Sequence, residues 1–295
     1  MQRGTVQLVK NHPVLRALVP VVFVVLVLAS LVIVKATGGP STGAASASKV
    51  VAGSTASTAR NTGTLPLPPD VGLQAASVSA STLAAIGTPS TTVALTPTGV
   101  QKTLIASDDK PEVLFVSAEY CPFCAAQRWP LVVALSRFGS FRGLSATQSS
   151  ASDVYPNTNT FSFYGSSFAS SSLNFTSIEL QTNQISGNSY ATLQTPTASQ
   201  DAILSQYDAA PYTSQPGSIP FLDIANKYVS VGSGYSPQLL QGLTLKQIAK
   251  QLNNPKSPVA TAIDGEANRI VAAITAATGV KPSPVAHTSL ATAGS

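Results

Sequence analysis

The chain has 295 residues, of which 44% are hydrophobic and only 10% are charged, compared with about 25% charged residues in an average soluble protein. This composition supplies enough apolar side chains for a sizeable core and excludes a highly charged disordered protein. The formal net charge of +5 arises at the N-terminus, because residues 1–69 hold six Lys or Arg and no acid, whereas residues 70–295 hold 17 − 6 = 11 Lys or Arg and 12 acids. The basic charge is therefore no indication of a nucleic-acid-binding domain.

The first organised feature is an apolar stretch at residues 17–34, ALVPVVFVVLVLASLVIV, which contains no charge. As a helix it would span about 27 Å, just short of a hydrocarbon core of about 30 Å. We interpret it as a transmembrane anchor, with a cleaved signal peptide and a buried core helix as the alternatives. Three cationic residues precede it, so the positive-inside rule predicts residues 1–16 in the cytoplasm. Everything after Lys35 is then outside, in a single-pass protein of the cell membrane.

Composition divides the rest of the chain into three parts. Residues 35–64 are rich in Ser, Thr, Ala and Gly and are expected to form a flexible linker, because they can bury little apolar surface. Residues 65–278 are expected to form the extracytoplasmic domain. Its segment 71–86 carries scattered apolar residues, typical of a short helix or strand packed on the domain. Residues 279–295 are expected to be a disordered tail.

Periodicity predicts the elements of this domain. Glu112–Ser117 is a continuous apolar run that indicates a strand buried on both faces. Residues 121–138 show helical spacing, and Gly139 suits the end of that helix. Further strands are expected at 144–148, 161–164, 175–181, 220–224 and 227–231, and further helices at 197–207, 243–252 and 259–278. The last two strands form a hairpin, and the whole pattern favours an α/β sheet with helices on both faces.

The sequence Tyr120-Cys121-Pro122-Phe123-Cys124 carries the chemistry. It follows the apolar strand and begins the helix, so Cys121 faces the unpaired N–H groups and the positive end of the helix dipole, which stabilise a thiolate. Pro122 suits the first turn because that position needs no helical hydrogen bond. Cys124 lies one turn deeper, where it can resolve a mixed disulfide.

Three functions compete for this cysteine pair. A zinc site needs two more ligands, but the chain has only two Cys, and its two His lie near the termini at positions 12 and 287. A structural disulfide would close a very short loop and restrict the unfolded chain little. A redox-active dithiol is favoured, because the strand–CxxC–helix context is the specific form of that motif.

The chain resembles the thioredoxin superfamily in three segments, which are Val113–Ser117, the Cys121–Cys124 turn and Ser218–Phe221. The resemblance implies a thioredoxin-like fold with a central mixed sheet flanked by helices, preceded by one N-terminal transmembrane helix. It also implies a cis peptide bond between Ile219 and Pro220, and an insertion between the active-site helix and the strand that this proline opens. Pro130 resembles the proline that kinks the active-site helix of thioredoxins.

The wider text is similar to the membrane-anchored domain-of-unknown-function family 929 over about residues 65–278. The matching segments include AEYCPFCAAQRWPLVVALSRFG, SSASDVYPNT at 149–158 and YGSSF at 164–168. Members of that family often carry a further Cys near the final helix. This chain has none there, so a mechanism with a third thiol is disfavoured.

Together these features predict a membrane-tethered extracytoplasmic thiol–disulfide oxidoreductase. Cys121 is the expected nucleophile, Cys124 the expected resolving thiol and Cys121–Cys124 the expected disulfide. The expected supporting residues are Pro122, Phe123, Ile219 and Pro220. No metal or organic cofactor is expected, and the expected partners are cysteine-containing extracytoplasmic proteins and a redox partner, without nucleic acid. The alternative is a non-catalytic thioredoxin-like binding module with an inert disulfide.

Four features near the cysteines are given structural interpretations. Glu119 is expected to cap the helix or lie at the surface, and Arg128 to be solvated. Trp129 is expected in the core or at its rim. The aromatic residues Tyr155, Phe161, Phe163, Tyr164 and Phe168 are expected to pack on the sheet as a strand, since aromatic residues are enriched in strands. The alternative is that they line a substrate groove.

Overall fold

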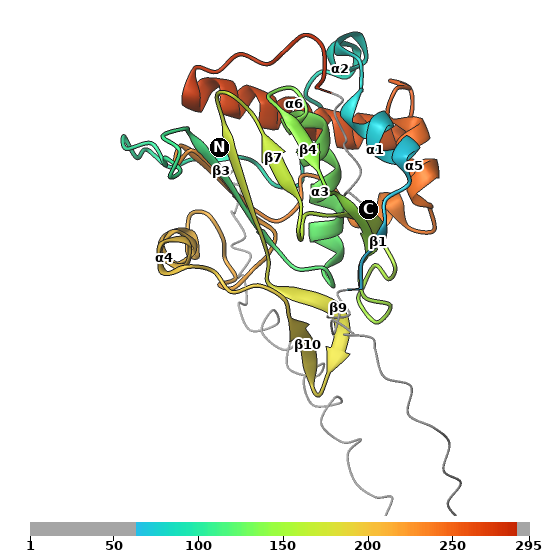
Figure 1. Ribbon diagram of the computed structural model, residues 1–295, viewed down its shortest axis with the longest axis horizontal. Helices are drawn as coiled ribbons and strands as arrows, with labels where there is room; N and C mark the ends of the chain where they lie inside the picture. Colours follow the sequence, from blue (N-terminus) through green and yellow to red (C-terminus); the bar gives the residue numbers. More distant parts are fainter. Residues whose placement is uncertain (1–62, 288–295) are drawn as a thin grey trace, which may run out of the picture. The chain divides into compact units, whose positions relative to one another are not determined.

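A five-stranded mixed sheet lies at the centre of the computed structural model, which describes residues 63–287 (Figure 1). The strand order is β2-β12-β11-β3-β8. The central strand β3 (Glu112–Ser117) runs parallel to β8 (Asn174–Glu179) and antiparallel to β11 (Phe221–Ile224). β12 (Tyr228–Val231) and β2 (Thr96–Pro97) complete the other edge by antiparallel pairing. The predicted α/β architecture, with a buried strand at 112–117 and a late hairpin, is confirmed.

The alternation of side chains along β3 explains why both faces of the sheet are covered. Val113 and Phe115 belong to the larger hydrophobic cluster, while Leu114 and Val116 belong to a second cluster. Successive side chains of a strand point to opposite faces, so an apolar run of this kind requires helices on both sides. Every position of β3 from Val113 to Val116 is apolar because its side chains fill two separate cores, one on each face of the sheet.

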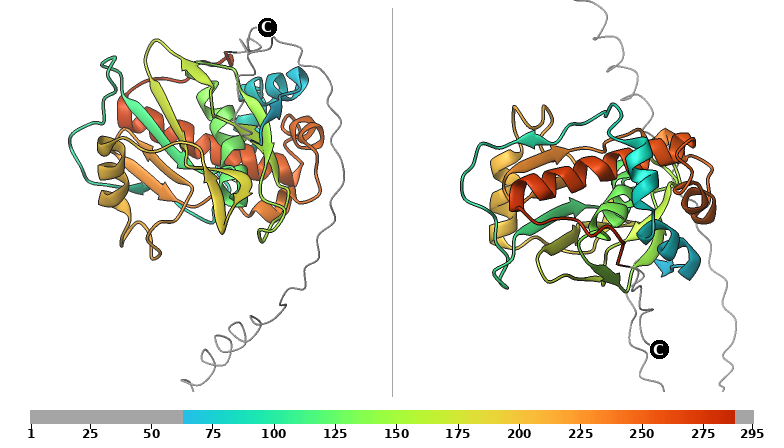
Figure 2. Two further views of the ribbon diagram at one scale, coloured as in Figure 1. Left: turned by 60° about the horizontal axis from the view of Figure 1, so that its bottom comes forward. Right: turned by 90° about the horizontal axis from the view of Figure 1, so that it is seen from above.

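More helices cover one face of the sheet than the other (Figure 2). α3 (Pro122–Leu135) and α6 (Pro258–Thr278) pack against each other in the larger cluster. The same cluster includes residues of α1 (Pro69–Ala76), α2 (Ala80–Ile86), α5 (Leu245–Gln251) and the short 3-10 helix η1 (Pro237–Leu240). α4 (Ala198–Tyr207) lies in the second cluster, through Ile203, Leu204 and Tyr207. The large helical layer therefore supports α3, the helix that begins with the CxxC motif.

Pro130 lies inside α3 without leaving an unpaired carbonyl. A proline has no N–H, so the carbonyl four residues earlier loses its helical donor. Here that carbonyl belongs to Ala126, and it accepts a hydrogen bond from the Tyr235 hydroxyl at 2.7 Å. The neighbouring Ala125 carbonyl accepts a hydrogen bond from the Thr160 hydroxyl, also at 2.7 Å. Side chains from distant segments thus fasten α3 at its proline.

An insertion of short strands separates α3 from α4. Its pairs are β4 (Ser140–Arg142) with β7 (Ser167–Ala169), β5 (Ser145–Gln148) with β6 (Asn159–Ser162), and β9 (Gln181–Ser186) with β10 (Ser189–Thr192). β1 (Leu65–Pro66) adds a third strand next to β5. The β9–β10 hairpin was not predicted, because its sequence is almost entirely polar or small and lacks an apolar face.

Phe163 and Phe168 of the insertion pack against the sheet, as predicted, whereas Tyr155 contacts Phe123 and Phe161 contacts Trp129 of α3. Phe141 lies within 5.0–5.7 Å, between ring centroids, of Phe163, Phe168 and Phe175. Phe163 also meets Phe115 of the central strand edge-to-face at 5.9 Å. Offset and edge-to-face contacts of this kind are favourable beyond the apolar area that they bury. The insertion is thereby attached to β3 and β8 by packing.

The predictions for the two ends of the chain have different outcomes, because most of the N-terminal segment lies outside the described residues while part of the C-terminal tail lies within them. The predicted cytoplasmic residues 1–16, the anchor at 17–34 and all but the last two linker residues lie outside the described residues. Within residues 63–287, no helix combines the length and hydropathy that crossing a bilayer requires. The start of the expected disordered tail differs from expectation, because Ser283 N donates to Arg137 O at 2.8 Å and His287 N donates to Ser136 O at 2.9 Å. These bonds satisfy carbonyls at the end of α3, which explains why the segment is ordered there.

The central core can be tested with a matched pair of isoleucines. Ile224 on β11 is 0% exposed, whereas Ile185 on β9 is 68% exposed. Replacing Ile224 with Ala should lower the free energy of unfolding by about 2–5 kcal/mol, because the deletion leaves a cavity in the core. Replacing Ile185 with Ala should change it by less than about 0.5 kcal/mol. Urea unfolding measures both, and equal losses in the two variants would contradict the fold.

Candidate active site

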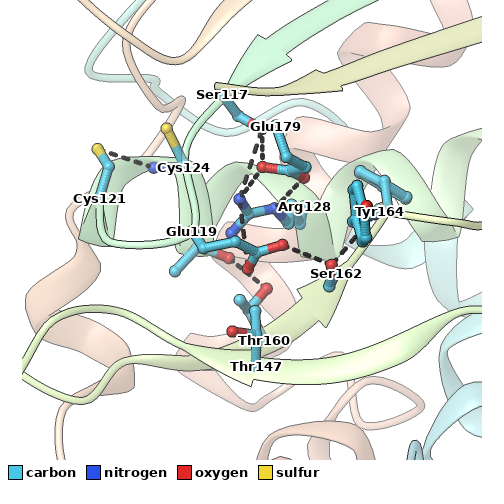
Figure 3. Close-up of polar contacts among 12 residues, drawn as sticks. Ser117, Glu119, Cys121, Cys124, Arg128, Thr147, Thr160, Ser162, Tyr164 and Glu179 are labelled. Atoms are coloured by element: carbon cyan, nitrogen blue, oxygen red, sulfur yellow. Dashed lines mark hydrogen bonds and ion pairs between the residues drawn. The ribbon is translucent and has the colours of Figure 1, made fainter. Parts of the chain in front are cut away.

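Cys121 occupies the position immediately before the first helical residue of α3 (Figure 3). β3 ends at Ser117, and Cys121 has the extended backbone of an N-cap, with φ −80° and ψ 122°. Its sulfur accepts a hydrogen bond from the Cys124 backbone N–H at 3.5 Å. Pro122 is the first residue of the helix, where its missing N–H costs nothing. The strand–CxxC–helix arrangement therefore places Cys121 Sγ at the N-terminal end of the helix, as predicted.

The two thiols lie in different environments. Both cysteines are free and buried, with 6% of Cys121 and 0% of Cys124 exposed. A side-chain hydrogen bond from Cys124 lowers the pKa of Cys121, opposed by burial and assisted by backbone N–H groups and by Arg128. Burial, followed by the neighbouring Cys121, raises the pKa of Cys124 well above its ordinary value. Cys121 is therefore the more acidic of the two thiols.

The backbone of Ile219, the residue before Pro220, lies next to Cys121. The Ile219–Pro220 peptide bond is cis, as predicted. The Ile219 carbonyl oxygen lies 3.9 Å from Cys121 Sγ, although 98 residues separate the two. This closeness follows from the sheet, because β11 begins at Phe221 directly after Pro220 and pairs with β3, which leads into the CxxC turn. The structure thus brings together Cys121 and Ile219, two of the predicted site residues.

Aromatic rings surround the site on the side of the insertion. Phe123 is 38% exposed, and its ring lies edge-to-face with that of Tyr155 at 5.8 Å between centroids. Tyr120 stacks on Tyr190 of β10, with ring centroids 4.1 Å apart. Phe123 was predicted as a supporting residue. Tyr190 was missed, because no local pattern connects it with a residue 70 positions earlier.

A buried ionic cluster lies along α3 behind the cysteines (Figure 3). Arg128 Nη2 is 2.5 Å from Glu179 Oε2, and Arg128 Nε donates to Glu179 Oε1 at 3.0 Å. Glu119 Oε2 lies 3.9 Å from Arg128 Nη2. The Ser117 and Ser162 hydroxyls donate to Glu179 at 2.6 Å and to Glu119 at 2.5 Å, respectively. All three charged side chains are 0% exposed, so the expectation of a surface Glu119 and a solvated Arg128 is wrong.

The physical reason for this difference is that each charge finds partners from distant segments. Burial alone would lower the pKa of Arg128, but the carboxylates of Glu179 and Glu119 outweigh burial and raise it. Burial raises the pKa of Glu119 to about 7, against the attraction of Arg128 and with the repulsion of Glu179. One guanidinium therefore serves two carboxyl groups, and the Glu119 carboxyl titrates near neutrality.

Metal binding has no support in this part of the chain. Within residues 63–287 no three His, Cys, Asp or Glu side chains are grouped so that they could hold an ion. The two cysteines on their own supply two of the four ligands that a structural zinc ion requires.

The difference between the two thiols predicts a selective alkylation. We expect iodoacetamide at neutral pH to modify Cys121 about tenfold faster than Cys124, or more, because the thiolate is the reactive form. Mass spectrometry of the Cys124→Ser and Cys121→Ser variants measures each thiol separately. Equal rates in the two variants would show that the α3 N-terminus does not distinguish them.

The Glu119 carboxyl predicts a pH dependence of stability. Its pKa is about 7 in the folded protein and 4.5 as the ordinary value, so the folded state binds more protons than the unfolded state between these values. The free energy of unfolding should therefore fall as pH rises from 4.5 to 7, by at most about 1.4 kcal/mol per pH unit for one group.

The Glu119→Gln variant should lack this part of the decline, because glutamine does not titrate. Urea unfolding at several pH values gives the wild-type-minus-variant difference, and the exposed Asp70→Asn exchange is the matched control. If the Glu119→Gln difference is constant across this range, Glu119 does not titrate there.

Comparison with known proteins adds a family to this geometry. No curated protein and no solved structure matches the chain. The family described as Domain of unknown function (DUF929) matches residues 97–276, which is more than half of the 295 residues and includes both cysteines, the ionic cluster and Pro220. The chain therefore belongs to the DUF929 family.

Proposed function

We propose that this chain is a membrane-tethered extracytoplasmic thiol–disulfide oxidoreductase with a thioredoxin-like fold. The observation that carries the proposal is the position of Cys121 Sγ, which accepts the Cys124 N–H at the start of α3 and lies 3.9 Å from the Ile219 carbonyl. A helix N-terminus stabilises a thiolate, which is the nucleophile in disulfide exchange. The buried Cys124 directly behind it is suited to resolve the mixed disulfide.

The thioredoxin-like fold is supported by topology. Four strands in the order β8-β3-β11-β12 pair as parallel, antiparallel and antiparallel. The CxxC motif lies between β3 and α3, and a cis proline precedes β11. In the superfamily that the sequence resembles, the motif and the cis proline face each other in this way.

The exchange begins with the Cys121 thiolate. It attacks one sulfur of a substrate disulfide, so that a Cys121–substrate disulfide forms, the substrate S–S bond breaks and the departing sulfur takes a proton from water. Cys124 then gives up its proton and attacks Cys121 Sγ, which releases the second substrate thiol and forms the Cys121–Cys124 disulfide. The protein loses two electrons and the substrate gains two. The reverse sequence oxidises a substrate dithiol, and the relative reduction potentials decide the direction.

Arg128 supports the thiolate from inside the protein. Its guanidinium is among the groups that lower the pKa of Cys121 and that oppose the rise in the pKa of Cys124. Glu179 and Ser117 fix the guanidinium by hydrogen bonds, so its charge is held in one place. Charges held in a buried site interact more strongly than charges in water. We assign Arg128 as a positioning residue rather than a catalytic residue.

The tether and the location rest on the sequence of residues 17–34 and on the cationic residues before it. A location outside the cytoplasm is compatible with the chemistry, because disulfides persist in oxidising compartments. The partners of the proposed reaction are then cysteine-containing extracytoplasmic proteins and a redox partner that recycles the Cys121–Cys124 pair.

One observation favours the alternative of an inert binding module, which is the burial of both sulfurs. Only 6% of Cys121 is exposed, so little of the residue is accessible to a substrate disulfide. A binding module would use the aromatic rim without exchanging disulfides. The two functions differ in whether substrates become covalently attached.

Trapping of mixed disulfides distinguishes the two functions. The Cys124→Ser variant should accumulate covalent complexes through Cys121, because no second thiol can resolve them. The Cys121→Ser variant should accumulate at least about tenfold less, since its remaining thiol is buried and keeps its proton. Non-reducing gel electrophoresis of the alkylated full-length variants measures the complexes. Equal trapping by both variants, or none by either, would favour the inert module.

A further inference from the structure

A cavity of about 200 Å³ opens on the α4 side of the sheet, next to the proposed active site. Its apolar wall consists of Val116, Leu180, Leu204, Ile219, Phe221 and Val231. An apolar cavity of about 150 Å³ is sufficient to hold benzene. The cavity therefore has room for one leucine-sized or phenyl side chain.

Ile219 lies between the cavity and Cys121. This residue lines the cavity, and its carbonyl oxygen lies 3.9 Å from Cys121 Sγ. An extended peptide advances about 3.3 Å per residue and points alternate side chains to the same side. A peptide whose cysteine has reached Cys121 can thus place a side chain in the cavity about two residues away.

The mouth of the cavity is acidic. Its lining includes Asp201 and Asp208 but no Lys or Arg. Asp208 accepts the Gly217 N–H with both carboxylate oxygens, at 2.7 and 2.8 Å, which fixes the loop before Ile219. Asp201 lies exposed in the first turn of α4, and no described side chain forms a hydrogen bond or ion pair with its carboxylate. The charge available at the mouth is therefore negative.

We propose that this cavity is a specificity site for an extended cysteine-containing segment that carries a large apolar side chain and, two residues further from the cysteine, a basic side chain on the same side of the segment. The apolar side chain fills the cavity and the basic side chain pairs with the Asp201 carboxylate, with Asp208 beside it. The proposal rests on the proposed disulfide exchange and adds the class of substrate to it. Proteins that carry an acidic residue at this position would react more slowly.

Four peptides test the site, each with one cysteine capped by glutathione as a mixed disulfide. The apolar position lies two residues from the cysteine and carries Leu or Ala, and the charged position lies two residues further on and carries Lys or Glu. The four peptides are named Leu-Lys, Leu-Glu, Ala-Lys and Ala-Glu, and each is made with these positions before and after the cysteine. The reduced full-length chain in detergent micelles should release the thiol of the Leu-Lys peptide about three- to tenfold faster than that of the Leu-Glu peptide. It should also react about tenfold faster with Leu-Lys than with Ala-Lys, because leucine buries more apolar surface.

Matched variants separate the two halves of the site. Ser205→Trp should fill the cavity and abolish the leucine preference, whereas Gln206→Trp, the neighbouring exposed position outside the cavity lining, should retain it. Asp201→Asn should reduce the lysine preference at least twofold. Asp109→Asn is its control, because it removes the same charge at an exposed residue outside the cavity. High salt should weaken the lysine preference and leave the leucine preference unchanged.

A small uncharged disulfide, hydroxyethyl disulfide, separates this site from the exchange reaction itself. All variants should react with it at the wild-type rate, because it does not reach the cavity. If the wild type does not react with it, the proposed function is wrong. If it reacts while the four peptides react equally, the specificity site is wrong. Unchanged peptide ratios in Ser205→Trp with an altered oligomeric state would assign the cavity to a second copy of the chain and also overturn the proposal.

Discussion

The arrangement of the site depends on the buried ion pair between Arg128 and Glu179. The Arg128 guanidinium is fully buried and touches Ser117 at the end of β3 and Glu179 at the end of β8, with Glu119 close by in the turn before α3. Glu119 is in turn held by Ser162 of β6. Breaking a buried ion pair by removing one partner typically costs about 3–5 kcal/mol, since the remaining charge is stranded. The cluster therefore specifies how the strand ends and the helix fit together.

The cluster has two carboxyl groups and one guanidinium, and this imbalance affects the pKa of Glu119. Two carboxyl groups share one guanidinium, and Glu179 accepts hydrogen bonds from its Nε and Nη2. Glu119 Oε2 and Arg128 Nη1 find no hydrogen-bond partner among the described side chains and backbone groups. Glu119 is thus the weaker partner, which is why burial dominates its titration and raises its pKa to about 7. Arg128 therefore faces Glu119 and Glu179 on one side and also acts on the pKa values of Cys121 and Cys124.

The sequence predicts those parts of the structure that depend on neighbouring residues. The strand at 112–117 follows from an uninterrupted apolar run, and the position of Cys121 follows from the strand, the CxxC spacing and Pro122. The charged cluster was missed because Arg128 and Glu179 are 51 residues apart, and a single sequence carries no signal that pairs them. The β9–β10 hairpin was missed because polar strands lack the alternation that identifies a strand. Long-range pairing is therefore what the structure adds to the site.

The site consequently has two sides with different physical roles. Inside, a fixed cation and the helix N-terminus act on the thiols, and these groups are too buried to contact a substrate. Nearer the surface, the Phe123–Tyr155 pair and the Tyr120–Tyr190 stack lie on the side of the insertion. Ile219 and the apolar cavity with its acidic mouth lie on the α4 side. In the proposed function, the acidity of Cys121 and the choice of substrate are therefore set by separate residues. On that proposal, exchanges at α4 change the substrate preference while the Arg128 cluster, which orders the core, stays intact.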